Sequence, residues 1–186
     1  MNNSVTIISF SPRNDGNCAK ICEYLSNHYM QTNVRSFFVN AENYNPCSGC
    51  NYECLTPGAV CPARTPYQME VMGAVKDSDL VYMIVPNFCG HPCANFYAFN
   101  ERCIGYFNGD RAVMNQYMSV PKRFIVISNT ESDTFKAVMK QQTNGEPDIL
   151  YMKTGKYKKR STAGDILDSE DAKADLDAFL SLVTLA

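Results

Sequence analysis

Residues 5–25, VTIISFSPRNDGNCAKICEYL, contain a predicted strand, turn and helix, and this pattern recurs along the chain. The apolar run VTIISF is rich in β-branched residues and ends at a cluster of turn formers, which predicts a buried strand over 5–10. From Asn17 onward apolar side chains recur at helical spacing, so 17–30 is predicted to be a helix. A strand that passes through a short polar turn into a helix is typical of proteins in which the two elements alternate.

The alternation continues to the end of the sequence. Apolar runs predict four further strands, at 34–39, 80–86, 123–129 and 148–152. Periodic segments predict four further helices, at 67–78, 93–107, 132–142 and 169–184, the last with Ser169 as its N-cap. Five strands that alternate with helices predict a parallel sheet covered on both faces, and right-handed crossovers narrow the topology to a doubly wound sheet. We therefore expect a single α/β domain over 1–186.

The composition gives no sign of a nucleic-acid or membrane partner. A chain of 186 residues with 45% apolar residues suits one globular domain, and its formal net charge of -2 offers little attraction to polyanions. The first residues lack the basic start and apolar core of a signal peptide. No apolar run approaches the roughly 20 residues that span a bilayer. We expect a cytoplasmic protein, in which thiols stay reduced.

The turn after the first strand carries groups that suit a phosphate. Ligands of doubly wound sheets bind beyond the carboxyl ends of the strands, and SFSPRNDGN lies at such an end. Ser9, Ser11, Arg13 and Asn17 are hydrogen-bond donors, and Gly16 permits close approach of the backbone just before a helix begins. The alternative is a plain turn between strand and helix, because Ser-Pro and Asp-Gly are common turn formers.

Two further loops are predicted at the same edge. VPNFCGHPCANF follows the third strand and places one aromatic residue, Phe88, in a polar loop, either against a planar ligand or in the core. SNTESD follows the fourth strand. The candidate residues of these two loops are Pro86, Asn87, Phe88 and Gly90, then Asn129 and Thr130. Three such loops on one edge indicate a binding site more strongly than any one of them.

Four of the nine cysteines lie in NPCSGCNYECLTPGAVCPA, residues 45–63, within a predicted loop over 41–66. They could form disulfides, bind a metal, carry electrons or pack. An odd total and a reducing compartment favour a metal site or a redox role. Structural zinc more often uses two close C-x2-C pairs, and iron–sulfur clusters take four grouped thiolates. The candidate ligands are Cys47, Cys50, Cys54 and Cys61.

Two blocks of the sequence resemble the flavodoxin-like NAD(P)H-dependent FMN reductases. SFSPRNDGNCAKICEYL is similar to their S-P-R-x-x-G-N-[TS] phosphate loop, and DSDLVYMIVPNFCGHPCANFYAFNERC to their flavin loop and following helix, where residues 100–102 match an Asp/Glu-Arg pair. The resemblance covers residues 4–130 and implies a flavodoxin-like sheet of strand order 2-1-3-4-5. It implies that the FMN phosphate is held by Ser9, Ser11, Arg13, Gly16, Asn17 and Cys18. It implies that the isoalloxazine is lined by Pro86, Asn87, Phe88, Cys89 and Gly90.

The cysteine loop resembles that of the iron–sulfur flavoproteins of the same family, which carry a compact cysteine motif at this place. The resemblance implies a [4Fe-4S] cluster on Cys47, Cys50, Cys54 and Cys61, or a vacant remnant of that site, with zinc as the third reading. The family's motif is C-x2-C-x2-C, and this chain has one extra residue between Cys50 and Cys54.

The expected activity is that of an FMN-dependent oxidoreductase using NADH or NADPH, in which hydride passes from the nicotinamide to bound FMN and then to a small-molecule or protein acceptor. The alternative is a non-enzymatic iron–sulfur flavoprotein that passes electrons between protein partners. No catalytic triad is found, and flavin chemistry needs none. We expect a homodimer, because 95–107 carries extra aromatic residues, Tyr97 and Tyr106. The basic run 153–161 is predicted to be a solvated loop, with attraction of the extra NADPH phosphate as a weaker idea.

Overall fold

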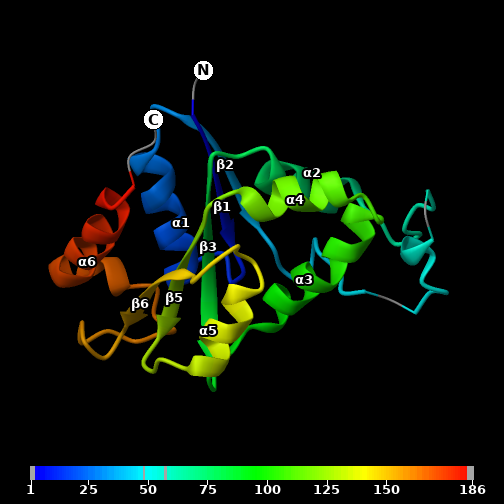
Figure 1. Cartoon of the computed structure of the whole chain (residues 1–186). Coiled ribbons are helices and arrows are strands. Elements are labelled where there is room, and N and C mark those ends of the chain that lie inside the picture. The colour runs from blue at the N-terminus through cyan, green and yellow to red at the C-terminus, as the bar shows by residue number, and fades with distance from the viewer. Residues whose placement is uncertain (1–2, 48, 57, 184–186) are drawn as a thin grey trace.

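A computed structural model describes residues 3–47, 49–56 and 58–183 of the chain. Its main sheet has five parallel strands in the order β2-β1-β3-β5-β6 (Figure 1). The strands are β1 (Ser4–Ser9), β2 (Asn33–Phe38), β3 (Leu80–Phe88), β5 (Lys122–Ser128) and β6 (Asp148–Lys153). If these five strands are numbered from 1 to 5 along the chain, their order across the sheet is 2-1-3-4-5. The predicted flavodoxin-like, doubly wound α/β fold is therefore confirmed.

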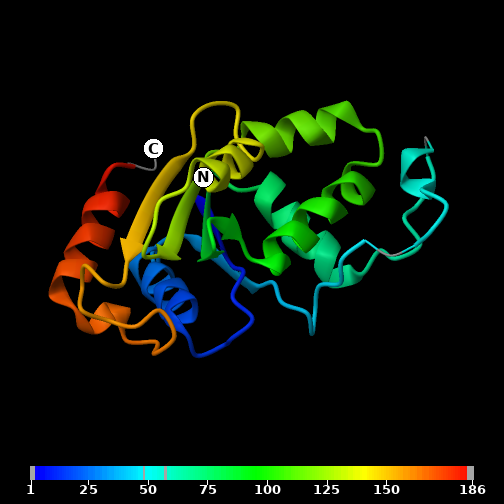
Figure 2. The same cartoon turned by 90° about the horizontal axis from the view of Figure 1, so that it is seen from below.

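Helices cover both faces of the sheet (Figures 1 and 2). One face carries α1 (Asn17–His28) and α6 (Glu170–Ser181). The other carries α2 (Pro66–Lys76), α3 (Ala94–Phe107), α4 (Arg111–Ser119) and α5 (Asp133–Lys140). Two short 3-10 helices, η1 (Glu53–Leu55) and η2 (Ile166–Asp168), lie in connecting segments. From β1 the chain moves to β2 on one side, and from β2 it crosses back over β1 to β3 on the other side. Because both crossovers are right-handed, α1 and α2 lie on opposite faces of the sheet.

The central strands are apolar throughout because both of their faces are buried. Along β3, residues 81, 83 and 85 enter the core beneath α2 and α3, while residues 80, 82 and 84 enter the core beneath α1 and α6. All six are at most 1% exposed. The unbroken run LVYMIV in the sequence is thus the expected pattern of a strand between two layers of helices.

Besides the two short 3-10 helices, the structure adds a helix and a strand that the sequence analysis did not predict. Helix α4 begins after Asp110, whose side chain accepts hydrogen bonds from Ala112 N and Val113 N, and Tyr117 is its one buried residue among those described. One buried position in nine leaves too weak a periodic signal to predict a helix. The second addition is β4 (His91–Pro92), which pairs antiparallel with the end of β3. Within the described residues, no helix is long and apolar enough to cross a membrane.

Helix α3 provides a test of the packing. Phe99 is fully buried, and its ring contacts Phe10 at 5.4 Å and Tyr44 at 5.8 Å between ring centroids, whereas Tyr97 on the same helix is 36% exposed. Phe99→Ala should lower the free energy of unfolding by about 3–5 kcal/mol, because it opens a cavity in the core. Tyr97→Ala, the matched control, should lower it by about 0.5 kcal/mol. Urea unfolding of both variants checks this, and equal losses would contradict the described packing of α3.

Candidate functional site

A pocket of about 390 Å³ lies at the carboxyl edge of the sheet, where β1, β3 and β5 end. Its volume falls within the usual range for sites that hold small ligands. It is lined by Ser11, Pro12, Arg13, Asn17, Cys18, Pro86, Asn87, Phe88, Ile127, Ser161 and Thr162. The structure therefore brings together residues of the first and second loops that the sequence analysis singled out. The lining residues that were not predicted as site residues are Pro12, Ile127, Ser161 and Thr162.

The first loop leads into α1 with its backbone donors uncovered by any side-chain cap. Gly16 is the N-cap residue, with φ -81° and ψ -178°, and no side chain of the described residues caps the helix there. The side chain of Arg13 folds across Gly16, so a Cβ at this position would lie 3.1 Å from an Arg13 guanidinium nitrogen. Ser11 Oγ accepts a hydrogen bond from Arg13 N at 3.2 Å and closes the turn. A helix N-terminus with free amides and a nearby guanidinium suits an anion.

Ser9 is a predicted phosphate residue with an orphaned hydroxyl in the described part of the chain. It is fully buried at the end of β1, and its Oγ has no hydrogen-bond partner among the described residues. It lies on the same side of β1 as Val5 and Ile7, which is the side that α1 covers. Buried hydroxyls are nearly always hydrogen-bonded, so an orphaned one beside the first loop fits a site that receives a further polar group.

Arg13 and Asn17 are both bonded to the segment that joins β6 to η2, residues 154–165, here called the strap. Arg13 Nη1 donates to Thr162 O at 2.6 Å. Asn17 Nδ2 donates to Ser161 O at 3.1 Å and to Arg160 O at 3.2 Å. The sequence analysis assigned these side chains to a phosphate, and the structure places a distant part of the chain against them.

The second loop is a tight hairpin between β3 and β4. Cys89 and Gly90 both have positive φ, 53° and 85°, as in the two-residue turns that suit the twist of antiparallel strands. Asn87 Oδ1 accepts a hydrogen bond from Gly90 N at 2.9 Å. The ring of Phe88 is 59% exposed beside the pocket, which excludes the core reading of this residue. An exposed aromatic ring at the edge of a pocket suits stacking against a planar ligand.

The third loop supports the pocket, and neither Asn129 nor Thr130 is among the residues that line it. Asn129 Oδ1 accepts hydrogen bonds from Gly155 N at 2.7 Å and from Thr154 Oγ1 at 2.9 Å, both in the strap. Asn87 Nδ2 donates to Ser128 Oγ at 2.8 Å, which joins the hairpin to the end of β5. Ser9, Gly16, Cys89 and Gly90 are likewise not among the lining residues.

Two buried thiols lie near the first and second loops. Burial and, to a smaller extent, the neighbouring Cys93 thiol raise the pKa of Cys18 to about 12. Cys93 Sγ donates to Phe10 O at 3.2 Å. Cys18 is therefore a neutral thiol at neutral pH and places no negative charge beside the proposed anion site.

The four-cysteine loop is held to α3 away from the pocket. Burial raises the pKa of Cys54, and smaller increases come from the thiols of Cys61, Cys50 and Cys47. These three thiols therefore lie within electrostatic reach of Cys54. Cys61 is buried against Gly105, where an added Cβ would lie 3.2 Å from Cys61 Cβ. Within residues 3–47, 49–56 and 58–183, no group of three or more His, Cys, Asp or Glu residues is placed to hold a metal ion.

The predicted Glu101-Arg102 pair anchors the two ends of this loop. Glu101 Oε2 accepts a hydrogen bond from Cys47 N at 3.1 Å. Arg102 is buried and donates to Ala63 O and, at 2.9 Å, to Gln68 Oε1. On the same helix Tyr97 is exposed and Tyr106 packs partly against the core. The homodimer expected from these two aromatic residues stays a prediction.

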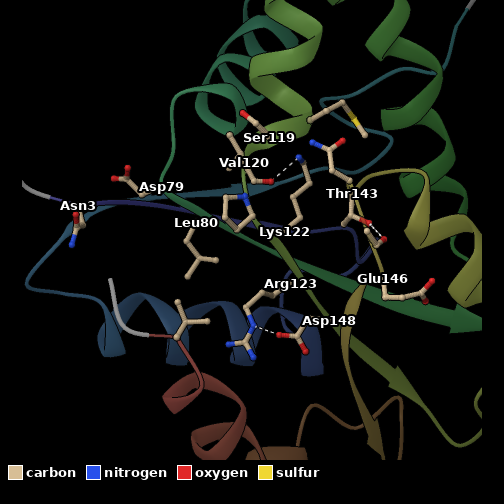
Figure 3. Close-up of a pocket in the computed structure, with 15 residues that line it drawn as sticks. Asn3, Asp79, Leu80, Ser119, Val120, Lys122, Arg123, Thr143, Glu146 and Asp148 are labelled. Atoms are coloured by element: carbon tan, nitrogen blue, oxygen red, sulfur yellow. Dashed lines mark hydrogen bonds and ion pairs between the residues drawn. The ribbon is translucent and has the colours of Figure 1, made fainter. Parts of the chain in front are cut away.

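A larger cavity, of about 580 Å³, opens at the opposite, amino edge of the sheet (Figure 3). Its two buried cations already bind groups of the chain. Lys122 Nζ donates to Tyr117 O at 2.5 Å and to Val120 O at 3.1 Å, and burial lowers its pKa to about 8. Arg123 donates to Asp148 Oδ2 at 2.6 Å and to Phe179 O at 2.7 Å. These contacts join strands and helices at this edge, and we assign the cavity no ligand.

The basic run 153–161 carries charges that are largely neutralised nearby. Lys153 Nζ lies 2.6 Å from Glu131 Oε1, Lys156 pairs with Asp175, and Lys159 lies 3.7 Å from Asp165. Exposed pairs of this kind add little stability, but they remove the uniform positive surface that nucleic acid needs. The geometry agrees with the predicted solvated loop.

Comparison with known proteins shows the fold. No family model matches the chain, and no curated protein matches it. Smu.1420 from Streptococcus mutans has a similar structure, with a TM-score of 0.66 and 13% identity over 96% of this chain and 99% of that one. A candidate quinone reductase from Klebsiella pneumoniae scores 0.65 with 11% identity over 97% and 85%. FerB, a flavoenzyme NAD(P)H:(acceptor) oxidoreductase from Paracoccus denitrificans, scores 0.52 with 12% identity over 96% of each chain.

The burial of the thiols predicts their reactivity. The thiolate is the reactive form, and burial raises the pKa of Cys22 to about 11 and that of Cys18 and Cys103 to about 12. Iodoacetamide at pH 8 should therefore modify the exposed Cys89 and leave these three intact until denaturant is added. Peptide mass spectrometry after timed alkylation checks this. Modification of Cys18 as fast as that of Cys89 would show that the first loop is open to solvent.

Proposed function

We propose that the chain is a flavoprotein oxidoreductase, which binds FMN at the carboxyl edge and accepts hydride from NADH or NADPH. The observation that carries the proposal is the pocket itself, in which an anion-type loop at the start of α1 faces a hairpin with an exposed aromatic ring. The names of two structural neighbours, a candidate quinone reductase and an NAD(P)H:(acceptor) flavoenzyme, support the same class.

The phosphate end of the ligand would lie against the first loop. Arg13 supplies the positive charge, the first turn of α1 supplies backbone amides, and Ser11 supplies a hydroxyl. The unpartnered Ser9 Oγ lies buried in the same region. These donors and the neutral Cys18 thiol give a site that favours a dianion over a neutral group.

The ring end would lie between the hairpin and the end of β5. Pro86, Phe88 and Ile127 offer apolar surface to a planar ring, and the Asn87 amide, bonded to Ser128 and Gly90, holds the hairpin in shape. A bound flavin takes hydride from a reduced nicotinamide and passes the electrons on, so the protein supplies binding, orientation and exclusion of water. This agrees with the lack of a catalytic triad in the sequence.

Arg13→Ala tests the phosphate assignment. Removing the guanidinium should weaken FMN binding by about 10- to 150-fold, which corresponds to about 1.5–3 kcal/mol for a charge-assisted contact. Riboflavin, which lacks the phosphate, should lose much less affinity than FMN, because only the contact between Arg13 and Thr162 of the strap is then lost. Arg111→Ala, on α4 away from the pocket, is the control and should leave both affinities unchanged. Flavin fluorescence titration gives the constants, and an unchanged FMN affinity in Arg13→Ala would refute the assignment.

A second candidate function is electron transfer without catalysis, through a cluster on the four-cysteine loop. The observation in its favour is that the other three thiols of the loop lie close enough to raise the pKa of Cys54. Leu55 and Ile104 beside them are 66% and 53% exposed and could face a protein partner. Reduction of bound flavin by added NADH or NADPH favours the enzyme. Reduction only by a second protein favours the carrier.

Cys54→Ser tests the four-thiol site directly. If the loop holds an iron–sulfur cluster, the variant purified without air should lose iron and sulfide and keep FMN, because four thiolates are needed and the pocket lies elsewhere. Cys89→Ser, at the exposed hairpin, is the matched control and should keep its iron. Elemental analysis for iron, sulfide and zinc gives the readout. Wild-type protein with full flavin and none of these elements would rule out both the cluster and zinc.

A further inference from the structure

The strap, residues 154–165, is tied to the first loop by a buried amide. Asn17 is 2% exposed and uses both ends of its side chain. Its Nδ2 donates to Arg160 O and Ser161 O, and its Oδ1 accepts from Ile166 N at 3.0 Å, just beyond the strap. Three hydrogen bonds from one buried side chain thus join the start of α1 to a segment more than 140 residues away (Figure 2).

Two further contacts bring the strap against the same loop. Arg13 Nη1 donates to Thr162 O. Gly164 has φ +72°, and a Cβ there would lie 2.7 Å from Asp15 O, so the two backbones approach more closely than any side chain permits. The contact therefore depends on particular residues in both segments, Arg13 in the first loop and Gly164 in the strap. A surface loop that is free to move would need neither of them.

The far end of the strap is held by the third loop. Asn129 Oδ1 accepts hydrogen bonds from Thr154 Oγ1 and Gly155 N. Tyr157, which is buried, donates from its hydroxyl to Asp175 of α6 at 2.6 Å. Asn129 is exposed and is not among the pocket-lining residues, and both hydrogen bonds of its Oδ1 go to the strap, so we expect its effect on a ligand to pass through the strap.

Between these anchors, Ser161 and Thr162 line the pocket opposite the hairpin. We propose that the strap is the third wall of the flavin pocket and that Asn17 and Asn129 are positioning residues, which order the strap and through it the ligand. The inference rests on the proposed function, because it concerns the same pocket. It changes the role of Asn17 from a phosphate ligand to a tie between two walls.

Limited trypsin digestion measures strap order without any ligand. The strap holds four cleavage sites, after Lys156, Lys158, Lys159 and Arg160. Asn17→Ala and Asn129→Ala should be cut at these sites faster than the wild type, and cleavage elsewhere should change less. Asn144→Ala, exposed at the opposite edge of the sheet, is the control and should match the wild type. Equal strap cleavage in all four proteins would overturn the inference.

Flavin titration separates positioning from direct contact. Asn129→Ala, which removes no pocket-lining group, should weaken FMN by about 2- to 10-fold, the effect of one hydrogen bond. Added FMN should slow strap cleavage in the wild type. If the strap of Asn129→Ala is cut faster but FMN affinity is unchanged, Asn129 orders the strap without affecting FMN binding, and the inference is overturned. If the wild type binds no FMN, the proposed function fails, and the ligand-free digestion alone decides whether Asn17 and Asn129 order the strap.

Discussion

Parallel pairing of β1 with β3 and of β3 with β5 is the constraint from which the candidate site follows. It places the carboxyl ends of three strands at one edge, and the loops after them converge there although they lie far apart in sequence. Helix α1 follows β1 through a short turn, so it begins at the same edge, with its positive end toward the pocket. The phosphate-type loop and the aromatic hairpin therefore meet because of the topology.

The two edges of the sheet differ in how their polar groups are used. At the amino edge, Lys122 and Arg123 are buried and already bonded to carbonyl groups, a hydroxyl and Asp148, although Arg123 Nη2 has no hydrogen-bond partner among the described residues. At the carboxyl edge, the amides of the first turn of α1 have no side-chain cap among the described residues, and Ser9 Oγ is orphaned. Cavity size alone points to the first edge, whereas the uncapped start of α1 beside Arg13 points to the second as a place for an anion.

Much of the fold and part of the site could be predicted from the sequence. Each of the five strands of the parallel sheet was predicted from a short apolar run next to turn formers. Their order was predicted from the resemblance to the flavodoxin-like reductases, and the structure has that order. The convergence of Arg13 and Phe88 on one pocket followed from the topology. The position of the strap could not be predicted, because the hydrogen bond from Asn17 to Arg160 joins residues 143 positions apart. In a sequence, an asparagine at the start of a helix looks the same whether its side chain binds a phosphate or a backbone carbonyl.

The most direct measurement is the absorption spectrum of the protein purified without air, with FMN supplied and unbound FMN then removed. The account predicts flavin bands at one flavin per chain, and their bleaching when NADH or NADPH is added. Protein that is folded, by circular dichroism, and that retains no flavin after this treatment would contradict it. In that case the pocket between the first loop, the hairpin and the strap would serve a different ligand.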